Sequence, residues 1–121
     1  MEIARLSKVG LENIVLGKTK RTFNCVVKFY SNECHLCHGL KNIYQKAAEA
    51  FDGKVHFLVF NSADHPSLEQ LIDVNGTPTI VFIKAQKNPI VNVMKDPKQP
   101  DTKSWYHSED IIQFIEDNLD A

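Results

Sequence analysis

Two cysteines separated by two residues are the feature of this chain best suited to chemistry: Cys34-His35-Leu36-Cys37. They follow an apolar segment, 23–30, that has the composition of a buried strand, and they open a segment whose apolar residues recur at helical spacing. Cysteines three apart on a helical turn have Cβ atoms about 5–6 Å apart, so a disulfide can close between them with a small adjustment. A C-x-x-C pair between a strand and a helix predicts dithiol–disulfide redox chemistry.

The two cysteines are expected to differ in role. A helix N-terminus carries partial positive charge and free N–H groups, which favour a thiolate on the first cysteine. Since the thiolate is the attacking form, we predict that Cys34 is the nucleophile and that Cys37, one turn deeper and more shielded, resolves the mixed disulfide. A protonated His35 would stabilise the thiolate and make the pair more oxidising. The carboxylate of Glu33 would oppose the thiolate.

The elements that must position this pair alternate along the whole chain. Apolar periodicity and turn residues predict the order β-α-β-α-β-α-β-β-α. The expected strands are 3–6, 23–30, 55–61, 79–84 and 90–94, and the expected helices are 7–16, 34–51, a short one after Pro66, and a last one capped by Ser108. A strand–helix–strand unit around Cys34 implies a right-handed crossover and parallel pairing, and the last two strands are close enough for an antiparallel hairpin. We therefore expect an α/β fold, with a mixed central sheet flanked by helices on both faces.

Length and composition set the limits within which this unit works. The chain has 121 residues, of which 43% are hydrophobic and 24% charged, so residues 1–121 are expected to form one globular domain. Fourteen basic against fifteen acidic residues give a net charge of -1, which offers no field for nucleic acid or an anionic membrane. No apolar run approaches membrane-spanning length, and no signal peptide is visible. Three cysteines are too few for a secreted disulfide scaffold, so a cytoplasmic protein is expected. Cys25 is expected to be an inert buried thiol.

A second motif, Gly76-Thr77-Pro78-Thr79, lies between a helix stop and a strand. With the cysteine pair it gives the chain a resemblance to thioredoxin-fold proteins over nearly its whole length. The residues that carry the resemblance are Val26-Val27-Lys28-Phe29-Tyr30 before the cysteine pair, the long helix after it, and Gly76-Thr77-Pro78-Thr79-Ile80-Val81-Phe82.

The resemblance implies a thioredoxin fold in which Pro78 is cis and Thr77 presents its backbone to an extended substrate peptide, beside Glu33 and His35 near the nucleophile. Lys28 stands where the family usually has a buried acid that helps to deprotonate the resolving cysteine. Lys28 could be a neutral base, an ion-pair partner, or a side chain that points to solvent. We favour the solvent-facing position, because burying a lysine without a partner is costly. The absence of the Trp-Cys-Gly-Pro-Cys signature marks a divergent member.

Three other functions fit parts of the same pattern. With His38, the cysteine motif becomes C-x-x-C-H, the c-type haem attachment pattern, but it would need an export route and a distal ligand such as Met94. A zinc site would need further ligands at suitable spacing, and none is evident. A redox-inactive domain that binds extended peptides is the third.

We favour a small protein disulfide oxidoreductase that requires no metal or organic cofactor. Its expected partners are protein disulfides and, as electron source, a reductase or a small thiol. We expect it to act as a monomer, without nucleic acid or membrane.

Overall fold

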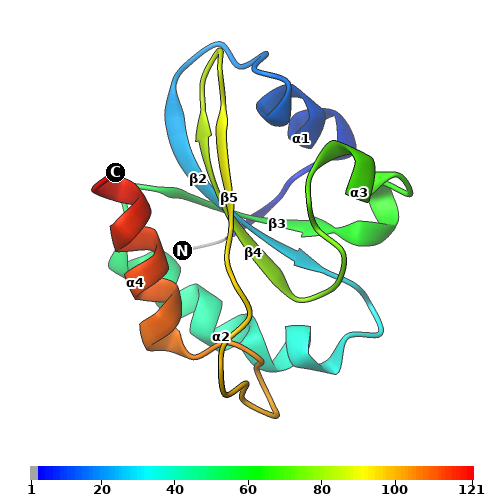
Figure 1. The fold of residues 1–121 in the computed structure, drawn as a ribbon, viewed down its shortest axis with the longest axis vertical. Coiled ribbons are helices and arrows are strands. Elements are labelled where there is room, and N and C mark those ends of the chain that lie inside the picture. The colour runs from blue at the N-terminus through cyan, green and yellow to red at the C-terminus, as the bar shows by residue number, and fades with distance from the viewer. Residues whose placement is uncertain (1–2) are drawn as a thin grey trace.

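The computed structural model describes residues 3–121, and its elements follow the order predicted from the sequence (Figure 1). It adds one 3₁₀ turn, η1, before the short third helix. The elements are β1 (Ala4–Arg5), α1 (Lys8–Val15), β2 (Phe23–Tyr30), α2 (His35–Ala50), β3 (His56–Asn61), η1 (Ser62–Asp64), α3 (Leu68–Leu71), β4 (Thr79–Ala85), β5 (Ile90–Val93) and α4 (Ser108–Leu119). None of the helices in residues 3–121 combines the length and apolar character needed to cross a membrane.

The five strands form one mixed sheet in the order β1-β3-β2-β4-β5. The central strand β2 runs parallel to β3 and antiparallel to β4, and β4 pairs antiparallel with β5. The parallel pairing of β2 with β3 across α2 and the antiparallel pairing of the last two strands confirm the predicted topology. Because β2 is hydrogen-bonded to a strand on each side, the strand that leads to the cysteine pair is fixed in the sheet.

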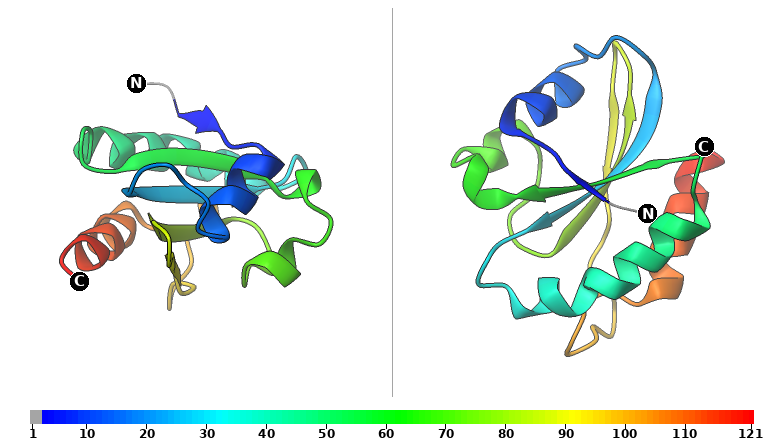
Figure 2. Two further views of the ribbon diagram at one scale, coloured as in Figure 1. Left: turned by 90° about the horizontal axis from the view of Figure 1, so that it is seen from above. Right: turned by 180° about the vertical axis from the view of Figure 1, so that it is seen from behind.

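Helices cover both faces of the sheet, as predicted. Helices α2 and α4 lie on one face, and α1 and α3 lie on the other (Figures 1 and 2). Successive side chains of a strand point to opposite faces, so β2 contributes to both cores. Cys25, Val27 and Phe29 pack with α1 and α3, whereas Val26 packs with α2 and α4.

Serine and glycine residues suited to helix ends flank α1 and follow α2. Ser7 caps α1 by accepting a hydrogen bond from the backbone N–H of Gly10 at 3.0 Å. Gly17 and Gly53 follow α1 and α2 with φ angles of +72° and +81°, a conformation that favours glycine. The predicted cap at Ser108 is wrong, because His107 is the N-cap residue and makes no side-chain capping bond. The Ser108 hydroxyl instead donates to the Glu109 carboxylate at 3.4 Å.

Candidate active site

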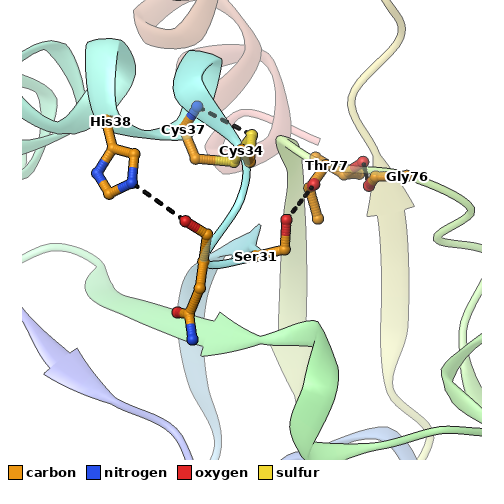
Figure 3. The surroundings of a disulfide bond; sticks show 8 residues. Ser31, Cys34, Cys37, His38, Gly76 and Thr77 are labelled. Carbon is orange, nitrogen blue, oxygen red and sulfur yellow. Dashed lines mark hydrogen bonds between the residues drawn. A yellow bond between two sulfur atoms is a disulfide. The ribbon is translucent and has the colours of Figure 1, made fainter.

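The cysteine pair lies where the chain leaves the central strand and enters α2. Cys34 is the N-cap of this helix, and its Sγ accepts a hydrogen bond of 3.0 Å from the backbone N–H of Cys37. The two side chains are joined in a disulfide, with Cα atoms 5.2 Å apart (Figure 3). The helix start thus places an N–H donor directly on the sulfur of Cys34, which is the arrangement that stabilises a thiolate.

The two sulfurs differ in accessibility in the predicted sense. Cys37 is 5% exposed and Cys34 is half-buried. An incoming disulfide therefore reaches Cys34 more easily than Cys37. The third cysteine, Cys25, is fully buried in the other core, and burial raises the pKa of its thiol to about 12, so it stays protonated.

The loop before β4 is tied to the loop that precedes the cysteines. The hydroxyls of Thr77 and Ser31 lie 3.2 Å apart, and the Thr77–Pro78 peptide bond is cis (Figure 3). Thr79 Oγ1 donates to the carbonyl of Gly76 at 2.6 Å, which closes the turn on its far side. Two segments that are far apart in sequence thus meet beside the disulfide.

The solvent-facing reading of Lys28 is wrong. Its side chain is 6% exposed, and its Nζ lies 5.1 Å from the centroid of the Tyr44 ring on α2. The cause is its place in β2: both faces of this strand are covered, so a residue between Val27 and Phe29 has no solvent to face. Burial, and next the like charge of Lys41, lower the pKa of Lys28 to about 8.

Lys28 and Cys37 both line one cavity of about 420 Å³ between α2 and the sheet. Lys41 and Tyr44 of α2 line it too, and neither is a site residue predicted from the sequence. Their spacing held the signal, since residues 37, 41 and 44 fall on one face of a helix. Ser31, which contacts Thr77, gave no sequence signal at all.

Glu33 and His35 are exposed on either side of Cys34. Neither side chain makes a hydrogen bond or salt bridge with any residue in the described part of the chain. His38, which completes the C-x-x-C-H pattern, has its Nε2 3.4 Å from the carbonyl oxygen of Asn32 (Figure 3). Within residues 3–121, no three His, Cys, Asp or Glu side chains cluster so that they could hold a metal ion.

A mixed five-stranded sheet with helices on both faces, and a disulfide-forming C-x-x-C pair after its central strand, define the thioredoxin fold with its cysteine motif. The Thioredoxin family model matches residues 6–108, and the chain belongs to the thioredoxin family.

Three individual relatives share at most 28% sequence identity with this chain. A thioredoxin from Borreliella burgdorferi is 28% identical over 68 residues, which cover 56% of this chain and 58% of that protein. The matched region is therefore little more than half of this curated relative. Among solved structures, chloroplastic thioredoxin z has a TM-score of 0.71 at 20% identity, over 100% of this chain and 97% of its own. One crystal form of ERdj5 has a TM-score of 0.73 at 15% identity, over 99% of this chain and 15% of its own. At these identities the two structures indicate the fold alone.

Proposed function

We propose that this protein is a thiol–disulfide oxidoreductase that acts on protein disulfides through Cys34 and Cys37. One observation carries the proposal: a half-buried cysteine caps α2, accepts a hydrogen bond from the backbone N–H of its partner, and is joined to that shielded partner in a disulfide. Membership of the thioredoxin family supports the same chemistry.

In the reducing direction, the Cys34 thiolate attacks one sulfur of the substrate disulfide. A mixed disulfide forms, and the other substrate sulfur leaves as a thiolate that takes up a proton. Cys37, deprotonated, then attacks the Cys34 sulfur, which closes the Cys34–Cys37 bond and releases the second substrate thiolate. Two electrons pass from the cysteine pair to the substrate. They are restored by a reductase or a small thiol.

Lys28 is proposed as the group that accepts the proton of Cys37. A thiol that is 5% exposed ionises with difficulty unless a base or a cation is near. Lys28 lines the same cavity, and because burial lowers its pKa to about 8, a fraction of its amine is neutral near pH 7 and able to take a proton. Its ammonium form then stabilises the Cys37 thiolate. Lys28→Met is expected to slow release of substrate from Cys34 while leaving formation of the mixed disulfide unchanged, as single-turnover mixing would measure.

Substrate contact is assigned to the surface around Cys34. Thr77 and Pro78 are proposed to present backbone to an extended peptide, and Glu33 and His35, which flank Cys34 in the sequence, are proposed to contact the same peptide. The Ser31–Thr77 contact supports this role, because it fixes the loop before β4 against the loop that carries the cysteines. Charge at Glu33 and His35 would then select among peptides and tune the thiolate.

Reduction of insulin by dithiothreitol, followed as turbidity, tests the proposed activity. Wild type is expected to accelerate precipitation, and Cys34→Ser is expected to reduce the rate to that of dithiothreitol alone. Cys25→Ser is the matched control, since it removes a buried thiol and should leave the rate unchanged. Equal acceleration by wild type and Cys34→Ser would contradict the enzyme and favour a redox-inactive peptide-binding domain.

A further inference from the structure

The cavity behind the disulfide has a charge pattern that the redox cycle does not explain. Its lining includes the side chains of Lys28, Lys41 and His38, and no Asp or Glu of the described chain contributes to it. Among residues 3–121 Lys28 forms no salt bridge, and Lys41 adds a second positive charge close enough to lower its pKa. Lys28 is 6% exposed, and its Nζ lies 5.1 Å from the centroid of the Tyr44 ring.

A buried ammonium without a counter-ion is costly, and a neighbouring like charge adds to the cost. An anion bound between the two lysines would reduce both the cost of burying the ammonium and the repulsion between the two charges. The Tyr44 hydroxyl does not serve this purpose, because it lies 3.0 Å from the Val26 carbonyl and 2.7 Å from the Leu58 carbonyl and is committed to the backbone. No carboxylate of residues 3–121 pairs with this cation, so an anion from solution can do so.

The rest of the lining indicates what the anion is attached to. A volume of about 420 Å³ falls within the range of small-molecule sites and exceeds what an inorganic ion fills. Ile3, Val59 and Tyr30 supply apolar wall beside the lysines. We propose that this cavity binds a small organic carboxylate, whose head lies between Lys28 and Lys41 and whose apolar body lies against Ile3 and Val59.

Binding of a carboxylate in this cavity would affect the reaction of the cysteine pair, an inference that rests on the proposed function. A bound carboxylate favours the ammonium form of Lys28, which can no longer accept a proton from Cys37. The ligand is then expected to slow the resolving step and to leave attack by Cys34 unchanged. The site would act as a brake on turnover that responds to a small metabolite.

Titration of the oxidised, isotope-labelled protein by nuclear magnetic resonance, at constant ionic strength, tests the binding itself. Hexanoate is expected to give saturable amide shifts around residues 28, 41 and 59, at least tenfold tighter than acetate, which lacks the apolar body. Hexanamide, which lacks the charge, is expected to give none. Lys28→Met and Lys41→Gln should each weaken hexanoate at least fivefold, and Lys46→Gln, which removes an exposed lysine of α2 outside the cavity, should not.

The affinity for hexanoate is also expected to fall as the pH rises through 8, where Lys28 loses its charge. Because Glu2 adjoins Ile3 in sequence, the titration is repeated with Glu2→Gln, so that a carboxylate of the chain itself does not mask the site. Absence of saturable shifts in both proteins, or equal responses to hexanoate and inorganic phosphate, would overturn the proposal. The insulin assay contains no carboxylate ligand and does not depend on this titration, so failure of this site and failure of the proposed activity are distinguishable.

Discussion

Lys28 shows most clearly how one side chain is controlled by its surroundings. The cysteine pair could be predicted from the sequence because its spacing and its place at a helix start are local properties. The burial of Lys28 depends on which helix covers β2 and on where Tyr44 falls on that helix. The burial of Lys28 could have been predicted in part, since a central strand covered on both faces leaves no solvent-facing position.

Replacing Lys28 by Met is expected to stabilise the protein in a pH-dependent way. The pKa of Lys28 is lowered from 10.5 to about 8, by burial first and by Lys41 second. Below pH 8 both the folded and the unfolded chain bind the proton, and the folded state carries the full cost of the buried charge. As the pH rises from 8 towards 10.5, the unfolded chain binds more protons than the folded one, so wild type gains stability.

Lys28→Met should therefore increase the free energy of unfolding at pH 7 by about 1–3 kcal/mol, and the advantage should shrink above pH 8. Urea denaturation at a series of pH values measures it. Lys46→Met, at an exposed position, serves as the control and should show no such trend. A difference that stays constant from pH 7 to pH 10 would contradict the buried-charge explanation.

His35 is expected to make the cysteine pair more oxidising. Its side chain is exposed in the first turn of α2, next to the nucleophile, where positive charge favours the Cys34 thiolate and hence the reduced form. We expect His35→Gln to make the pair more reducing, as measured by equilibration with glutathione buffers, with Leu36→Met as the control. An unchanged or more oxidising couple would rule out this role.

At the scale of elements, α2 packs closely against a distant loop, and the sequence of the helix gives little indication of this contact. The stripe of apolar residues predicts the helix, and Leu40, Tyr44 and Ala47 are buried as that stripe requires. Gly39 is different: a Cβ at this position would collide with the carbonyl oxygen of Lys103, in the loop before α4. A glycine inside a helix is a sign of close approach, but the approaching segment lies far along the chain and could not be named from local pattern.

Gly39→Ala is accordingly expected to destabilise the protein, because backbone must move to admit the methyl group. The free energy of unfolding should fall by about 1–3 kcal/mol, typical of overpacking. Gly76→Ala is the matched control, since a Cβ there meets no atom within 4 Å and the residue has no positive φ. Thermal and urea unfolding of both variants would measure this, and equal stability of the two would contradict the steric account.

At the scale of the whole molecule, the sheet and its two cores hold the site in place while the disulfide opens and closes. The order of elements along the chain and the parallel pairing around Cys34 could be predicted, because alternating strand and helix segments leave few ways to connect a parallel unit. The contact between Thr77 and Ser31 could not be predicted from the sequence, because it joins two loops whose residues are 46 positions apart. Cys34 and Cys37 lie within one turn of helix, so their bond constrains no other element.

Reduction of the disulfide is therefore expected to leave the fold unchanged. Amide shifts between the oxidised and reduced protein should be confined to residues around 31–41 and 76–79, and the strands β1, β3 and β5 should not respond beyond their contacts with these segments. Two-dimensional nuclear magnetic resonance of the two states measures this directly. Shifts spread through α1 and β5 would show that the cysteine pair is a structural link instead of a local redox centre.

The assignment of Cys34 as nucleophile and Cys37 as resolving cysteine is tested most directly by trapping the mixed disulfide. Reduced Cys37→Ser and reduced Cys34→Ser are each mixed with a peptide disulfide, and the products are weighed by intact mass spectrometry over time. Cys37→Ser should accumulate one mixed disulfide per chain, at Cys34, and keep it, whereas Cys34→Ser should react far more slowly because its remaining site cysteine is shielded. Equal rates of adduct formation in the two variants, or a faster adduct on Cys37, would contradict Cys34 as the nucleophile.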